Sequence, residues 1–324
     1  MPRPLSPSPA PPDRPVPPTL LCVANYPSNT GFAWDFIESL YARVAERLAP
    51  RGVRTLVAYP ELRGAPRPLE GSVAEAVELP FDLSDRRRRR EVLRFVRHQN
   101  VRAVYLTDQP AFSPWYPLLR LAGVRHLVMH DHTSGARTAP RGVRRAAKWL
   151  YARFPGVSAD VVVGVSEYVA ERTRRVGLIS PSRVVRVWNG LPVAAGGDAQ
   201  AIRRAAGVEE GRAIVACCCR AHPVKGVAFL LRAFDAAWRA LPVASRPVLV
   251  YIGDGPQLGE LEEIRDSLES RADVRFLGYV EDAARLLAGA DACAVPSVWE
   301  DAFPLGVLEP MSMGKPVVAA SVGG

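Results

Sequence analysis

The sequence predicts an α/β protein built from two doubly wound lobes. Short apolar segments alternate with helix-like segments from residue 19 onward. The apolar segments are unbroken runs of Val, Leu and Ile, which are typical of strands buried on both faces of a parallel sheet. The alternation stops at a Gly- and Ala-rich stretch, residues 192–200, and then begins again. This interruption predicts a linker between two lobes.

The first lobe is expected to cover residues 19–191. A helix is expected to begin near Trp34 and to end at Gly52, because glycine commonly terminates a helix. The expected strands cover residues 19–25, 54–59, 102–107, 125–130, 160–165 and 183–188.

The second lobe is expected to cover residues 192–324. In doubly wound sheets, ligands bind beyond the carboxyl ends of the strands, so the loops that follow the strands are the first places to search for a site. The expected strands cover residues 212–219, 246–253, 273–278, 291–296 and 315–320, and the expected helices cover residues 225–240, 256–270, 281–287 and 304–313.

The composition is that of a globular protein. The 324 residues are 48% hydrophobic, which suffices for two domains, and the absence of an apolar run of eighteen residues argues against a membrane-spanning helix. Residues 1–18 are rich in Pro and lack the apolar core of a secretory signal, so we expect a disordered tail. The five cysteines lie in apolar segments, which favours buried thiols and a cytoplasmic location.

The net charge of +9 indicates an anionic partner, and much of this charge lies in residues 85–99. A solvated helix face explains that segment most simply. The alternative is peripheral contact with an anionic membrane surface or another polyanion. No nucleic-acid-binding motif accompanies the charge, so nucleic acid is not expected as a partner.

Four loops of the second lobe combine residues that suit a nucleotide. Arg220 and Lys225 lie beside a helix start, where two cations and free N–H groups can hold a diphosphate. Gly253 follows a strand and permits close approach of a ligand. Gly278, with Val280 after it, turns the chain so that backbone groups can face a base. Taken singly, these residues are equally well explained as surface charges and ordinary turns.

The fourth loop leads into an expected helix that holds Glu309 in its interior. A carboxylate there can accept two hydrogen bonds from a vicinal diol such as a ribose. The alternative is a solvated helix residue.

These loops resemble, in order, the donor-binding domain of retaining glycosyltransferases with the GT-B fold, family GT4. The motifs are "RAHPVKGVAFLLRAF", "VYIGDGP", "VRFLGYV" and "EDAFPLGVLEPMSMGKPVVAASVGG", within residues 213–324. The segments "ADVVVGVSEYVAERTRRVG", "VVRVWNGLP" and "HLVMHDHTSG" of the first half resemble the family more loosely. The resemblance implies two Rossmann-like lobes, of which the second is incomplete.

The resemblance also implies roles for residues of the second lobe. Arg220 and Lys225 would hold the donor diphosphate and stabilise the departing charge, and Glu309 would bind the ribose. The paired-acid motif of the family has seven residues between its acids, which selects Asp301 rather than Glu300 as the first acid, although either could contact the sugar. Backbone N–H groups of the segment formed by Phe303, Pro304 and Leu305 would complete the contacts.

Three residues of the first lobe fall at positions that matter in the family. The glycine pair of the acceptor-side loop is reduced to Gly31 in "NTG". His130 ends a strand where a histidine can reach the transferred sugar. Asp108 stands where some relatives have a histidine, so the resemblance assigns it no firm role.

No metal ligand is expected. We take His130 and His132 to project from opposite faces of an extended strand, so that joint ligation of a metal would need a sharp turn. The chain contains no Asp-x-Asp triplet, which agrees with the metal-independent chemistry that the resemblance implies.

The function implied is transfer of a hexose from a nucleotide-diphosphate sugar to a hydroxyl acceptor, with retention of configuration and without a cofactor. A nucleotide-sugar epimerase or phosphorylase of the same fold is an alternative. Relatives continue beyond the point that corresponds to Gly324, so an incomplete or inactive nucleotide-sugar-binding chain is another.

Overall fold

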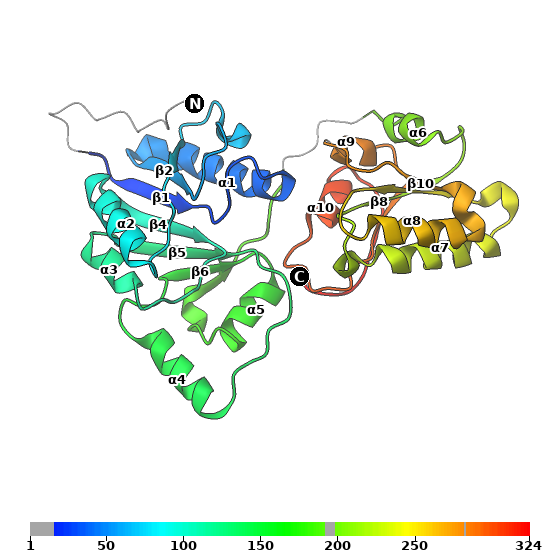
Figure 1. Ribbon diagram of the computed structural model, residues 1–324. Coiled ribbons are helices and arrows are strands. Elements are labelled where there is room, and N and C mark those ends of the chain that lie inside the picture. Colours follow the sequence, from blue (N-terminus) through cyan, green and yellow to red (C-terminus); the bar gives the residue numbers. More distant parts are fainter. Residues whose placement is uncertain (1–15, 192–197, 282) are drawn as a thin grey trace. The chain divides into compact units, whose positions relative to one another are not determined.

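The computed structural model describes residues 16–191, 198–281 and 283–324 (Figure 1). Most of the predicted N-terminal tail and of the predicted linker therefore lies outside the described residues. The chain forms two compact units. The first comprises the described residues up to Thr133 and Arg137–Val187, and the second comprises Ser134–Ala136 and the described residues from Trp188 to Gly324.

The first unit is built on a seven-stranded parallel sheet with the strand order β3-β2-β1-β4-β5-β6-β7. The strands are β1 (Thr19–Val23), β2 (Arg54–Tyr59), β3 (Glu75–Glu78), β4 (Val101–Thr107), β5 (His126–Asp131), β6 (Val161–Gly164) and β7 (Val184–Arg186). The helices are α1 (Phe32–Leu48), α2 (Arg86–His98), α3 (Tyr116–Leu121), α4 (Gly142–Arg153) and α5 (Glu167–Arg175).

The second unit is built on a five-stranded parallel sheet with the strand order β10-β9-β8-β11-β12. The strands are β8 (Ile214–Cys218), β9 (Val248–Ile252), β10 (Val274–Phe276), β11 (Ala292–Val295) and β12 (Val317–Ala319). The helices are α6 (Ala201–Ala206), α7 (Val227–Ala240), α8 (Leu258–Ser267), α9 (Ala283–Leu287) and α10 (Leu305–Ser312).

The predicted strands are all present. The apolar runs of the central strands are buried on both faces of the sheets, whereas the edge strands β7 and β12 have exposed residues. Every residue of β1 and of β9 is buried. The predicted α/β class is therefore confirmed. Among the described residues, no helix has the length and apolar character needed to cross a membrane.

The structure corrects the expected elements in three places. Strand β3 was not predicted, because it is a four-residue edge strand with one buried residue and acids at both ends. Helix α1 ends at Leu48, and a short 3-10 turn carries the chain to Gly52, whose φ of 71° is left-handed. The helix expected over 256–270 is two elements, α8 and a 3-10 helix at Glu269–Asp273.

Each sheet has one point where the strand order reverses. The chain moves outward from β1 to β3 and returns to place β4 on the other side of β1; in the second sheet β9 and β11 flank β8 in the same way. At such a point the loops after two neighbouring strands run in opposite directions. They leave a crevice at the carboxyl ends of those strands. The loops after β1 and β4, and those after β8 and β11, are therefore the places to look for ligands.

Helix α7 offers a matched test of the second core. Leu231 is fully buried, whereas Phe229 on the same helix is 66% exposed. We expect Leu231→Ala to lower the free energy of unfolding by about 2–5 kcal/mol, because a buried cavity is left. Phe229→Ala should change it by less than about 0.5 kcal/mol. Urea titration of both variants measures this, and equal losses would contradict the packing described.

Candidate functional site

The ion pair between Lys225 and Asp301 joins the two loops at the reversal point of the second sheet. Lys225 ends the short 3-10 helix that follows β8, and Asp301 lies in the loop after β11. The Lys225 Nζ lies 2.9 Å from one carboxylate oxygen of Asp301 and 2.8 Å from the other. The Ser297 hydroxyl donates to the same carboxylate at 3.0 Å. Two residues that the sequence assigned separately to phosphate and sugar thus form one unit.

The Asp301 side chain is only 13% exposed, and that of Lys225 is 28% exposed. A carboxylate at this depth requires a partner, because desolvation penalises an unpaired charge. Asp301 therefore fixes the position of the Lys225 ammonium group. Arg220, in the same loop as Lys225, is exposed.

Glycines allow the loops of this edge to approach one another closely. Gly226 has φ 69°, and a Cβ atom there would lie 2.0 Å from the Pro296 carbonyl oxygen. A Cβ atom on Gly253, where φ is 154°, would lie 2.0 Å from the Cys219 carbonyl oxygen. The Gly253 N–H also donates to the Gly278 carbonyl at 2.8 Å. The loops after β8, β9, β10 and β11 therefore form one continuous surface.

The two glycines predicted to contact a nucleotide differ in the reason why a side chain is disfavoured at their position. At Gly253 the neighbouring backbone excludes a side chain, whereas at Gly278 the left-handed φ of 68° favours glycine and the surrounding space is open. Val280 is partly buried and packs against the apolar core of the second unit. The base-contact role of Gly278 and Val280 stays a prediction.

Glu309 lies on α10, where it is only 9% exposed. This burial contradicts the alternative of a solvated helix residue. It raises the pKa of the Glu309 carboxyl group from 4.5 to about 7. A carboxyl group whose pKa is raised by burial is a candidate for a functional site.

A cavity of about 160 Å³ lies beside this helix in the second unit. Ser297, Asp301, Phe303 and Pro304 line it, together with residues of α10 and of the segment after β11 and β12. Pro304 immediately precedes α10, whose first residue is Leu305. The Val307 N–H donates to the Pro304 carbonyl at 3.1 Å. The N–H groups before it, at the very start of α10, can donate to an anionic or polar ligand.

Glu300 does not take part in the ion pair between Asp301 and Lys225. One of its carboxylate oxygens accepts a hydrogen bond from the Ala136 N–H at 3.2 Å, and its carbonyl accepts one from Gly135 at 2.7 Å. Both partners belong to the same compact unit as Glu300. The two neighbouring acids therefore contact different groups. Asp301 contacts the Lys225 ammonium group, and Glu300 contacts backbone N–H groups.

The first unit buries His130 at the end of β5 and half-buries His132 just beyond it. Their ring centroids are 4.1 Å apart. The expectation that the two histidines project from opposite faces is wrong, because residues i and i+2 of an extended strand share a face. Among the described residues, no cluster of three or more His, Cys, Asp or Glu side chains is arranged to hold a metal ion.

Both imidazoles are neutral near pH 7. Burial lowers the pKa of His132 to about 4 and that of His130 well below its usual value. The Tyr105 hydroxyl hydrogen-bonds to Nδ1 of His130, whereas the Nε2 atoms of both histidines are buried without a partner among the described residues. Buried nitrogens without a partner are uncommon, which marks this pair of histidines as a candidate for a functional role.

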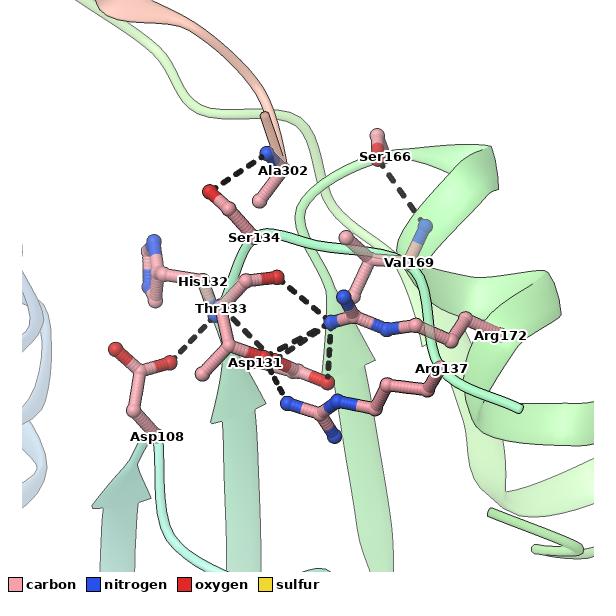
Figure 2. Close-up of polar contacts among 10 residues, drawn as sticks. All are labelled: Asp108, Asp131, His132, Thr133, Ser134, Arg137, Ser166, Val169, Arg172 and Ala302. Carbon is pink, nitrogen blue, oxygen red and sulfur yellow. Dashed lines mark hydrogen bonds and ion pairs between the residues drawn. The ribbon is translucent and has the colours of Figure 1, made fainter. Parts of the chain in front are cut away.

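The loop that follows β5 is held by a buried ion pair that the sequence did not reveal (Figure 2). The Arg172 guanidinium lies 3.1 Å from the Asp131 carboxylate, and it donates to the Thr133 carbonyl at 2.7 Å. Both charged side chains are at most 6% exposed. Helix α5 also buries Val169 and Thr173. Arg172 lies at helical spacing from Val169, and this spacing could have predicted that its side chain faces inward.

Asp108 lies at the reversal point of the first sheet, directly after β4. Its φ of 53° is left-handed, and its carboxylate accepts a hydrogen bond from the backbone N–H of His132 at 2.6 Å. Burial raises the pKa of the Asp108 carboxyl group to about 6. Gly31, which precedes α1, has φ 121° and open space around it. Asp108 and the two histidines therefore form one polar cluster, and Gly31 lies on the other loop of the reversal point.

The raised pKa of Glu309 gives stability a particular pH dependence. A carboxyl group that binds its proton more tightly in the folded chain makes the free energy of unfolding fall as pH rises from about 4.5 to about 7. We expect Glu309→Gln to remove up to about 3 kcal/mol of this fall. Urea titrations of both proteins at pH 5 and pH 8 measure the difference, and parallel pH profiles would contradict the burial of the charge.

The Asp131–Arg172 pair should be costly to break. Arg172→Ala leaves the Asp131 carboxylate buried without its counter-charge, and we expect a loss of about 3–5 kcal/mol. Arg175→Ala is the matched control, because the Arg175 side chain on the same helix is 77% exposed. Thermal and urea unfolding compare the two variants. Equal losses would show that the buried pair does not hold this loop.

Two family models match the chain. The model described as "Glycosyl transferases group 1" matches residues 212–324, and that described as "Glycosyltransferase Family 4" matches residues 37–195. The glycosyltransferase EpsF of Bacillus subtilis is 30% identical over 203 residues, which cover 61% of this chain and 52% of EpsF. The D-inositol 3-phosphate glycosyltransferase of Salinispora arenicola is 35% identical over 192 residues, which cover 50% of this chain and 43% of that enzyme. The chain spans about half the length of these curated relatives.

Solved structures share the fold. HepE of Anabaena in complex with UDP has a TM-score of 0.69 at 20% identity, over 95% of this chain and 81% of HepE. A glycosyltransferase of Rickettsia africae has a TM-score of 0.73 at 18% identity, over 95% of this chain and 80% of the neighbour. Together the two family models match most of the chain and show that it belongs to the GT4-type glycosyltransferases, and the solved structures share its GT-B fold.

Proposed function

We propose that the protein transfers a hexose from a nucleotide-diphosphate sugar to a hydroxyl acceptor, with retention of configuration and without a metal ion. The observation that carries this proposal is the edge of the second sheet, where Lys225, held by Asp301, and exposed Arg220 lie in loops joined to that of Gly253. Two cations in loops that meet at the carboxyl ends of parallel strands suit a diphosphate.

A solved neighbour suggests which donor to test first. HepE of Anabaena has been solved with UDP-glucose. At 20% identity this likeness concerns the fold alone, so a uridine-diphosphate hexose is the first donor to test rather than an assigned one. Glu309 would accept hydrogen bonds from the ribose hydroxyls, for which its carboxylate form is required.

In the proposed reaction the bond between the anomeric carbon and the diphosphate oxygen breaks as the acceptor oxygen bonds to the same face of the sugar. Arg220 and Lys225 stabilise the charge that develops on the departing diphosphate. An oxygen of that diphosphate accepts the proton of the acceptor hydroxyl. Asp301 acts here as a positioning residue, because its carboxylate holds the lysine.

Donor binding tests the site directly. We expect isothermal titration of the full chain against uridine-, guanosine-, adenosine- and thymidine-diphosphate hexoses, in EDTA, to identify one bound donor. Arg220→Ala should weaken that binding about 10- to 100-fold, because a hydrogen bond to a charged group contributes about 1.5–3 kcal/mol. Arg232→Ala, an exposed change on α7, is the matched control.

Two results would count against the proposal: no donor binds, or binding survives Arg220→Ala unchanged. The configuration of the product at the anomeric carbon, measured by NMR, tests retention. Turnover that proceeds without an acceptor, or that requires inorganic phosphate, would instead indicate an epimerase or a phosphorylase.

A further inference from the structure

We propose that helix α4 is a docking surface for an anionic lipid bilayer. The helix exposes large apolar side chains that water-facing helices ordinarily keep inside: Val143 is 86% exposed, Leu150 67% and Phe154, just after the helix, 63%. Positions 143, 150 and 154 recur at helical spacing, so they lie along one face. Trp149, which is 48% exposed, lies beside this face.

The opposite face of α4 fixes the helix to the first unit. Ala152 is buried, and its carbonyl accepts a hydrogen bond from the Ser158 hydroxyl. The Lys148 ammonium donates to the Val176 carbonyl at 2.8 Å, and the Tyr151 ring meets Phe112 edge-on at 5.4 Å. Since this face already supplies the packing of α4, the apolar outward face is a second surface. Figure 1 shows α4 at the lower end of the first unit.

The segment around α4 carries positive charge alone. Between Asp131 and Asp160 the sequence has no acidic residue and six basic ones. Arg141, Arg144 and Arg145 are exposed at the start of the helix. Arginines beside an apolar, aromatic-containing face are the features of a helix that lies in the headgroup region, where each cation near an anionic surface adds to the attraction.

The basic helix α2 differs from α4 because its apolar side chains are not exposed. Its arginines are exposed except for half-buried Arg89, but its apolar residues Val92 and Val96 are fully buried in the first core. Helix α2 can therefore attract an anionic surface but has no large apolar side chain of this kind to insert. The membrane contact expected from the charge of residues 85–99 is thus better supported at α4.

A bilayer suits this face better than a second copy of the chain. Pairing two α4 helices would bring their positive charges together, and the repulsion would oppose association. A lipid surface supplies both negative headgroups and acyl chains, so it satisfies the arginines and the apolar side chains at once. An acidic protein surface is the rival occupant, and the experiment separates it.

Vesicle flotation of the full chain tests this surface without any donor, so its outcome does not depend on the proposed activity. We expect binding to phosphatidylcholine vesicles that contain 30% phosphatidylglycerol, and at least tenfold less binding to phosphatidylcholine alone. The combined change Val143→Ser, Leu150→Ser and Phe154→Ser should reduce binding to anionic vesicles at least tenfold. Val73→Ser with Val243→Ser, at exposed sites elsewhere, is the matched control.

Three results would overturn the proposal. The first is no binding to anionic vesicles. The second is binding that survives the α4 changes but is abolished by Arg90→Gln with Arg94→Gln on α2. The third is binding to polyglutamate in place of vesicles. Circular dichroism and thermal unfolding of the α4 variant keep the test valid, because these side chains are exposed and their removal should leave folding unchanged.

Discussion

The arrangement of both units depends on parallel pairing of their strands. Every described strand pair in the two sheets is parallel, so the carboxyl ends of all strands in a sheet lie along one edge. Parallel strands also need helical crossovers that cover both faces, which is why the central strands β1 and β9 are buried along their whole length. Polar residues lie mainly at the strand ends, as His130 and Asp131 do at the end of β5, and in the loops that follow.

Within the second unit, the loops at this edge support one another through backbone contact and charge. Gly226 and Gly253 let neighbouring strands' loops touch at distances that a side chain would prevent. The lysine–aspartate pair then connects the loop after β8 to the loop after β11. The first unit uses another device, a buried arginine that holds the loop after β5. The two sheets thus share a topology but stabilise their loops differently.

The sequence predicts the alternation of strands and helices well, because buried parallel strands leave an unbroken apolar signal. The family resemblance assigns Lys225, Asp301 and Glu309 to a donor site, and these roles stay a prediction; the structure shows Lys225 paired with Asp301 and Glu309 buried. The sequence does not predict that Lys225 and Asp301 pair with each other, since 76 residues separate them in the chain. The Asp131–Arg172 pair was missed for the same reason. The short edge strand β3 was missed because one buried residue gives no periodic pattern.

If Glu309 binds the ribose as proposed, its burial would link ligand binding to the proton concentration. With a pKa of about 7, this carboxyl group is partly protonated at neutral pH. A ligand whose two hydroxyl groups must both donate to it selects the ionised form and expels the remaining proton into solution. The heat released on binding would then include the ionisation heat of the buffer that takes up this proton. Titrations in phosphate and in Tris would accordingly differ in enthalpy while agreeing in affinity.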